Sequence, residues 1–151
     1  RDPAKRVVMK PDLVRNTEQG FELSAEDVAL AEGQRTELFH HMREFMDGFD
    51  FLVIPTNPTP PLPIGQTSVE KIDDKPMTDY LEGAALKSAI STVGNPAISV
   101  PAGFTPEGWP VGVQIVGRHG ADLSVLQFAH AFEQATRVGE RLPALLNDTA
   151  S

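Results

Sequence analysis

The chain has 151 residues, which is enough for one domain with a sizeable core but not for two. Its 13 Lys and Arg against 21 Asp and Glu give a formal net charge of −8, so we expect no nucleic-acid partner, because phosphate binding needs clustered cations. The absence of cysteine excludes disulfides and thiolate nucleophiles and fits a cytoplasmic protein. No apolar run approaches the roughly 18 residues that cross a bilayer, so no membrane partner is expected.

The first expected helix follows a segment, 1–23, that has only weak periodicity and is expected to wrap a surface. Ser24, with the acidic Asp27 three positions later, is typical of a capping box at a helix start. Apolar side chains then recur at spacings of three and four. This pattern predicts an amphipathic helix from Ser24 to about Asp47 that Gly48 ends.

A buried strand and a proline-rich loop come next. The run 50–54 is short and mostly apolar, which is typical of a strand that is covered on both faces of a sheet. Five prolines in Pro55–Pro63 exclude both a helix and a central strand, because proline lacks an N–H and fixes φ. We therefore expect a stiff, packed loop after the strand.

A second helix is expected to begin at a cap formed by Thr78 or Asp79 and to run to about Val93. Gly94 stands where a left-handed residue usually ends a helix. Pro96 prevents the helix from continuing.

The remaining elements complete an α/β fold. Two buried strands are predicted at 97–101 and 111–117, and the short proline-glycine turn between them favours an antiparallel pair within a mixed sheet. A last helix is expected from a cap at Asp122 to about Arg137, closed by Gly139.

The chemistry-bearing side chains form no catalytic motif of their own. Neither Ser99 nor Ser124 lies in a G-x-S-x-G turn, so both are interpreted as structural. His40 and His41 are adjacent and cannot share one metal from a helix, and no zinc or phosphate-binding motif occurs, so we expect no metal and no cofactor. Asp73 and the aspartate after it are read as a solvated turn.

Three ordered motifs carry a resemblance to a known family. These are G-N-P-A-I-S-V-P-A-G at 94–103, G-W-P-V-G-V-Q-I-V-G at 108–117, and D-F-L-V-I-P-T at 50–56. Together with the last helix they resemble the C-terminal part of the amidase signature family, over roughly residues 20–138. The resemblance implies an α/β/α fold with a large mixed sheet flanked by helices, and hydrolysis of a carboxylic amide.

The resemblance also implies that the catalytic machinery lies elsewhere. Family members use a Ser-Ser-Lys triad in a Gly/Ser-rich segment of their N-terminal part, and no such segment occurs here, so no catalytic residue is assigned to this chain. Because the chain begins with Arg1 rather than Met, we expect it to be the C-terminal part, 1–151, of a single amidase domain. Its core is expected at 24–138 and a tail at 139–151, and we expect it to be inactive alone.

The expected partners are a small-molecule amide, the N-terminal catalytic part of the same protein and, if apolar faces are left exposed, a homo-oligomer. Substrate-binding residues are predicted in the loops next to two strand ends. Thr56 and Pro58 follow the first strand, and Thr92, Gly94 and Asn95 precede the second. An alternative for Asn95 is a hydrogen bond from its side chain to the backbone.

Two other functions remain open. The glutamine-dependent tRNA amidotransferase A subunit belongs to the same family, but its branch has an Asp shortly after a Tyr-Leu pair. Here Tyr80 and Leu81 are followed only by Glu82, which favours a plain small-amide hydrolase. The other alternative is a non-catalytic binding or assembly module.

Overall fold

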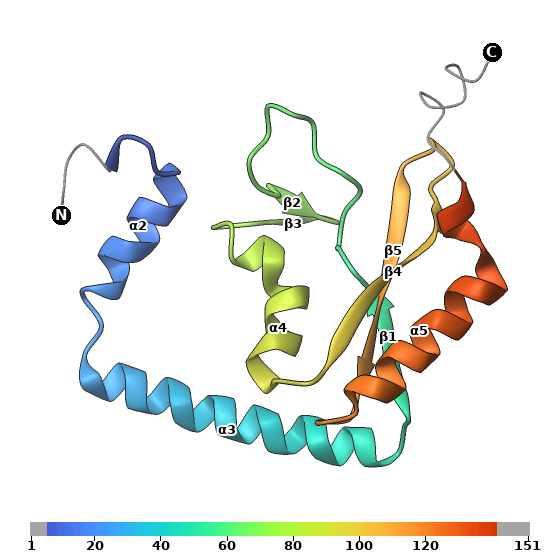
Figure 1. Ribbon diagram of the computed structural model, residues 1–151. Helices are drawn as coiled ribbons and strands as arrows, with labels where there is room; N and C mark the ends of the chain where they lie inside the picture. The colour runs from blue at the N-terminus through green and yellow to red at the C-terminus, as the bar shows by residue number, and fades with distance from the viewer. Residues whose placement is uncertain (1–5, 142–151) are drawn as a thin grey trace.

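The structure, a computed structural model, describes residues 6–141. The helices are α2 (Pro11–Gly20), α3 (Ala25–Asp47), α4 (Ala85–Val93) and α5 (Asp122–Thr136), with short 3-10 turns η1 (Glu82–Ala84) and η2 (Val138–Glu140). The strands are β1 (Phe51–Pro55), β2 (Lys71–Ile72), β3 (Lys75–Pro76), β4 (Ala97–Phe104) and β5 (Pro110–Gly117). Figure 1 shows β1, β4 and β5 with α5 on one side, α4 on the other and the long α3 running past one end.

The long helix α3 confirms the predicted start and end. The Ser24 hydroxyl accepts a hydrogen bond from the Asp27 amide at 3.1 Å, and the Asp27 carboxylate accepts one from the Ser24 amide at 2.8 Å. This is the predicted capping box, and the bonds from Ser24 lower the pKa of Asp27. Gly48 ends the helix in a right-handed rather than a left-handed conformation.

Helix α2 is an element that the sequence pattern did not predict. Pro11 occupies its first turn, where a missing N–H costs nothing, but none of its side chains is buried. Its pattern is amphipathic, but the helix has only 10 residues, fewer than the roughly 11–18 over which a helical period is recognised. The expectation that 1–23 wraps a surface stays a prediction.

The main sheet has the order β1-β5-β4, and both neighbours of β5 run antiparallel to it. The positions of the predicted strands are confirmed, with β4 continuing three residues beyond its predicted end to Phe104. The prediction that they are buried is wrong for β1 and β4, because Val53 is 47% exposed and Ser99 is exposed. Gly108 takes φ +90° in the predicted turn between β4 and β5. The α/β class is confirmed, but β5 separates the two strands that share a direction, so the described residues contain no parallel pair of the kind that a mixed sheet needs.

The second helix begins later than predicted. Asp79 accepts hydrogen bonds from the amides of Leu81 and Glu82, so the predicted cap serves the 3-10 turn η1, and regular α-helix starts at Ala85. Gly94 ends α4 at φ +74°, the predicted left-handed conformation.

The boundaries of the last helix also differ from those predicted. Asp122 is the first residue of α5 and makes no side-chain cap. At the other end, Arg137 itself takes φ +50° and its amide donates to Glu133, so Arg137 closes the helix and Gly139 belongs to η2. The prediction that Gly139 closes the helix is therefore wrong. A positive φ is uncommon for a non-glycine residue but can be adopted, as it is at Arg137.

A small hairpin joins the proline-rich loop to η1. Strands β2 and β3 pair antiparallel, and Asp73 in the turn between them takes φ +50°. Asp74 is exposed and its carboxylate pairs with Lys71 at 3.0 Å. The predicted solvated aspartate turn is confirmed, although its two short strands were not predicted.

The two faces of β5 are packed differently, because successive side chains point to opposite faces. Ile115 lies on the face that α5 covers, where it forms the core with Val100, Val125 and Ala129. Gly117 lies on this face too, and a Cβ there would overlap the Cγ2 of Val125. The close approach of α5 to β5 therefore requires glycine at this position.

Arg118 ties the end of α3 to the end of β5. Its Nε donates to the carbonyl oxygens of Met46 and Phe49, each at 3.1 Å, and its guanidinium lies 3.6 Å from the Asp50 carboxylate. A cation at a helix C-terminus satisfies carbonyls that have no partner within the helix and favours the helix dipole.

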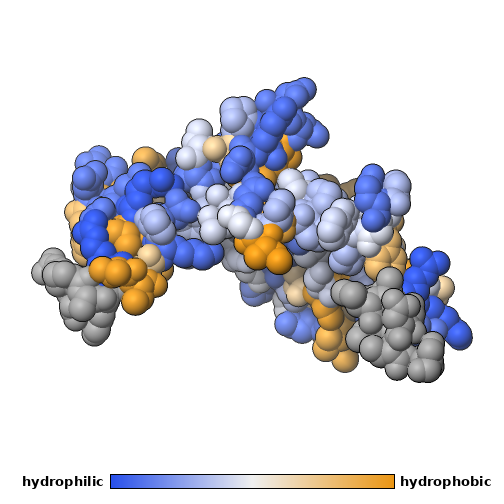
Figure 2. Space-filling view, turned by 90° about the horizontal axis from the view of Figure 1, so that it is seen from above, coloured by the Kyte–Doolittle hydropathy of each residue, from blue (hydrophilic) through white to orange (hydrophobic). Residues whose placement is uncertain are grey.

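Much apolar surface remains open. Large apolar side chains such as Leu30, Val53 and Trp109 are 63%, 47% and 51% exposed. Figure 2 shows separate hydrophobic patches on the face seen from above. Within the part of the chain that the structure describes, no helix is both long and apolar enough to span a bilayer.

We predict that Gly117→Ala lowers the free energy of unfolding by about 1–3 kcal/mol, because α5 must move away from β5 to admit a methyl group. Denaturant unfolding measures the change. Gly33→Ala, on α3 where an added Cβ meets nothing within 4 Å, is the control and should stabilise by about 0.5–1 kcal/mol. Equal effects of the two changes would contradict the close packing proposed for Gly117.

Candidate functional site

Two hydroxyl groups meet on the sheet face opposite α5. Thr56 continues β1, with its amide donating to the Gly112 carbonyl at 3.0 Å, and its Oγ1 lies 2.7 Å from Ser99 Oγ on β4. Between them, Gly112 leaves room for the pair, because a Cβ on Gly112 would stand 3.1 Å from Thr56 Oγ1 and 3.2 Å from Ser99 Oγ. Three strands thus present one hydrogen-bonded hydroxyl pair at an accessible position.

Gln114 lies next to this pair on the same face of β5. In the register of the sheet it is directly opposite Ser99. Its Nε2 is buried and has no hydrogen-bond partner among the described residues. An unpaired buried amide donor costs free energy, so this face carries an unused polar group as well as exposed hydroxyls.

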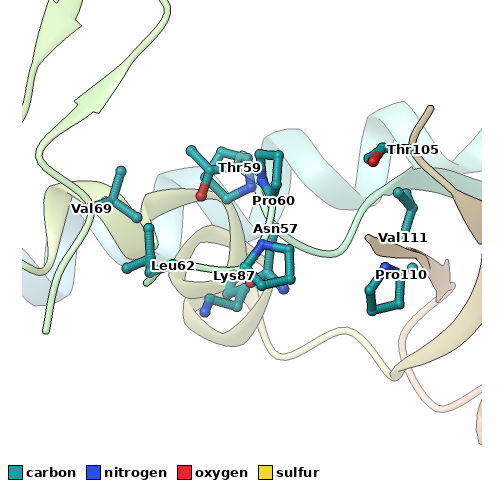
Figure 3. A pocket seen from close by; sticks show the side chains of 13 residues that line it. Asn57, Thr59, Pro60, Leu62, Val69, Lys87, Thr105, Pro110 and Val111 are labelled. Carbon is teal, nitrogen blue, oxygen red and sulfur yellow. The ribbon is translucent and has the colours of Figure 1, made fainter. Parts of the chain in front are cut away.

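A cavity of about 550 Å³ lies on this side of the sheet and includes Gly112 in its lining. Figure 3 shows its lining: Asn57, Thr59 and Pro60 of the proline-rich loop, Lys87 of α4, and Thr105, Pro110 and Val111 near the β4–β5 turn. Gly112 also lines it, so the cavity reaches the floor on which Thr56 and Ser99 meet. The proline-rich loop forms one wall, and this wall is stiff because proline fixes φ.

A charged network supports the other wall. Lys75 Nζ lies 2.6 Å from the Glu82 carboxylate, which also accepts hydrogen bonds from the amide and the hydroxyl of Thr78. The bond from Lys75, followed by those from Thr78, lowers the pKa of Glu82 from 4.5 to about 2. The network anchors the β2–β3 hairpin to η1, whose Gly83 lines the cavity.

The five predicted substrate-binding residues divide between the two ends of the sheet. Thr56 contacts Ser99 at the Gly112 end, and Pro58 lines the cavity there. Asn95 lies at the opposite end, where its Nδ2 donates to the Gly117 carbonyl at 2.8 Å. This is the side-chain-to-backbone bond that the sequence left as the alternative for Asn95.

The other two predicted residues also lie away from the cavity. Thr92 is exposed on α4 and its hydroxyl donates to the Ser88 carbonyl at 2.7 Å, while Gly94 serves to end that helix. The structure therefore does not bring Thr92, Gly94 and Asn95 together with Thr56. A substrate role for each of the five stays a prediction.

Sequence reasoning missed Ser99, Gln114 and Lys87 as members of this site. Ser99 was interpreted as a structural serine inside a buried strand, but it is exposed and alternates with the buried Val100. That alternation was a usable signal, because one face of the strand reads as apolar and the other as polar. Within residues 6–141, no group of three or more metal-ligating side chains comes together.

The family follows from the comparison with known proteins. The family model named Amidase matches residues 4–126. The chain belongs to the amidase family, and its α/β fold is the part of the amidase signature fold that these residues build.

Individual relatives agree with this assignment. The A subunit of the glutamyl-tRNA(Gln) amidotransferase of Bacillus cytotoxicus is 41% identical over 106 residues, which are 70% of this chain and 21% of the relative. A crystal structure of a bacterial aryl acylamidase of the amidase signature family matches 89% of this chain and 28% of that protein, with TM-score 0.79 and 27% identity.

The crystal structure of the A subunit of the glutamyl-tRNA(Gln) amidotransferase of Thermotoga maritima matches 89% of this chain and 28% of that protein, with TM-score 0.59 and 29% identity. The chain spans about a fifth of the length of the curated relatives that it matches.

We predict that Gly112→Ala lowers the free energy of unfolding by about 1 kcal/mol, because its methyl group would push Thr56 Oγ1 and Ser99 Oγ apart. A double-mutant cycle with Ser99→Ala tests the cause by denaturant unfolding. The cost of Gly112→Ala should fall in the Ser99→Ala background, where one of the crowding oxygens is absent. An unchanged cost would show that the hydroxyl pair is not what requires glycine.

We predict a pH dependence from Glu82. Its pKa is lowered by folding, so its stabilising contribution is complete above about pH 4.5 and is lost as the pH falls toward about 2. The difference in stability between the natural protein and Glu82→Gln should therefore be largest near pH 6 and shrink steadily below pH 4.5. A difference that grows on acidification would contradict the Lys75 and Thr78 contacts as its cause.

Proposed function

We propose that this chain is the C-terminal region of an amidase that hydrolyses a carboxylic amide to an acid and ammonia or an amine. In this assignment it supplies one wall of the substrate pocket, and the remainder of the amidase domain supplies the Ser-Ser-Lys triad. The observation that carries the proposal is the Thr56–Ser99 hydroxyl pair, which lies beside Gly112, a lining residue of the cavity on the sheet face that α5 leaves open.

The geometry of the pair suits binding rather than bond cleavage. Thr56 and Ser99 hydrogen-bond to each other, and no histidine, aspartate or glutamate lines the cavity beside them among the described residues. Without an adjacent base a hydroxyl is a poor nucleophile, but it can donate and accept hydrogen bonds that orient an amide. The pair and the Gln114 amide are accordingly assigned to positioning.

The extent of the match supports the same division of labour. The chain covers 21% of one relative and 28% of another. Exposed apolar side chains, such as Val53 at 47% and Trp109 at 51%, would be covered when the rest of an amidase domain packs against them.

The second candidate function is that of an amidotransferase A subunit. The 41% identity to the Bacillus cytotoxicus protein favours it. Against it, the residue nearest to the acidic position of that branch is Glu82, whose carboxylate is already bonded to Lys75 and Thr78. We therefore favour a small-amide hydrolase over glutamine-dependent transfer.

Two measurements of amide hydrolysis test the proposal, one on this chain alone and one on the natural protein, by which we mean the full-length protein that contains the chain. We expect the purified 151-residue chain to release no ammonia from simple carboxylic amides. The natural protein should release it, and the gene should encode a Gly/Ser-rich nucleophile segment with a preceding Lys upstream of Arg1. Hydrolysis by the chain alone at the rate of a full-length relative would overturn the proposal, and a start codon directly before Arg1 would favour a binding module.

A matched pair of variants in the natural protein tests the pocket wall. Thr56→Val removes a hydroxyl at the cavity and should raise KM roughly five-fold with kcat less affected, as loss of one hydrogen bond implies. Thr36→Val removes a hydroxyl that donates to the Glu32 carbonyl within α3, away from the cavity lining, and should leave KM unchanged. Equal effects on KM would place the substrate away from the Thr56 end of the sheet.

A further inference from the structure

The cavity next to Thr56 has an unusual charge for this protein. The chain carries 21 Asp and Glu against 13 Lys and Arg, yet none of the thirteen residues that line the cavity is acidic. Its one charged lining residue is Lys87, in the first turn of α4. Among residues 6–141, Lys87 makes no ion pair.

The acidic residue nearest to Lys87 in the chain does not neutralise it. Glu82 is five positions earlier, and both of its carboxylate oxygens are occupied, Oε1 by Lys75 at 2.6 Å and Oε2 by the amide and hydroxyl of Thr78. Its low pKa, about 2, follows from these bonds. The Lys87 ammonium group is therefore available for a partner from outside the described residues.

The rest of the lining is mainly apolar. Leu62, Val69, Val111 and several prolines supply the walls, and Figure 3 shows Lys87 between Leu62 on one side and the Val111 wall on the other. A concave, apolar lining with one charged group fixes the orientation of a ligand that is apolar along its length and charged at one end. A positive group selects an anion, and an ammonium pairs with a carboxylate.

We propose that this cavity binds the acyl chain of an amide substrate whose far end carries a carboxylate, with Lys87 as the group that recognises that carboxylate. This inference rests on the proposed amidase function. Gly112 lines the cavity and also lies under the Thr56–Ser99 pair, so the amide end of the ligand lies toward the hydroxyls and the acid end lies toward α4. Lys87 is thus a specificity-determining residue and takes no part in bond cleavage.

The experiment compares matched substrates with the natural protein. Succinamate, glutaramate and adipamate each carry an amide at one end and a carboxylate at the other, and butyramide, pentanamide and hexanamide are the neutral amides of similar length. We expect kcat/KM to be higher for at least one acid amide than for its neutral counterpart. Lys87→Gln should lower kcat/KM for that acid amide roughly ten-fold, mainly through KM, and leave the neutral amide unchanged.

Two further variants separate the role of Lys87 from a general charge effect. Lys87→Arg keeps the positive charge and should retain most of the preference. Lys71→Gln removes an exposed lysine whose partner is Asp74 on the hairpin, away from the cavity lining, and should leave the preference intact. A preference that survives Lys87→Gln, or that Lys71→Gln abolishes equally, would overturn the inference.

A binding measurement distinguishes failure of this inference from failure of the proposed function. If the natural protein hydrolyses neither acid nor neutral amides, the proposed function fails, and calorimetric titration with adipate then tests the cavity without catalysis. Adipate binding that Lys87→Gln weakens roughly ten-fold would support the anion site, whereas no binding, or equal binding by both proteins, would overturn it.

Discussion

The structure depends on the central strand β5 having no side chain at two positions, one on each face. At Gly117 a Cβ would overlap Val125, so glycine there lets α5 approach and form the core around Ile115. At Gly112 a Cβ would crowd the hydroxyls of Thr56 and Ser99, so glycine there lets two flanking strands join their side chains across a third. One strand thereby builds a core on one face and a polar site on the other.

The two ends of β5 differ as sharply as its faces. Burial increases along the strand from the exposed Pro110 to the buried Ile115, Val116 and Gly117. At the buried end, the Asn95 amide and the Arg118 guanidinium hold α3, α4 and the strand ends together through backbone carbonyls. The open end, where Gly112 lies, borders the cavity instead.

Features of the fold could be predicted from the sequence where they depend on residues that are close together in the chain. The capping box at Ser24, the left-handed Gly94 and the antiparallel pair formed by β4 and β5 depend on neighbouring residues, and all three were predicted. The Thr56–Ser99 contact joins residues 43 positions apart, and only the register of three strands brings them together. For that reason Thr56 could be proposed from its strand end and the alternation in β4 could mark Ser99 as outward-facing, but nothing local could pair the two.

The same reasoning explains why Asn95 does not lie beside Thr56. It was grouped with Thr56 because both stand next to strand ends, and strand ends often build sites in α/β proteins. That rule applies to strands whose ends meet at one edge of a sheet. Thr56 follows the end of β1 while Asn95 precedes the start of β4, and these two strands run in the same direction on either side of β5. The end of one strand and the start of the other therefore lie at opposite ends of the sheet, with Thr56 beside Gly112 and Asn95 beside Gly117.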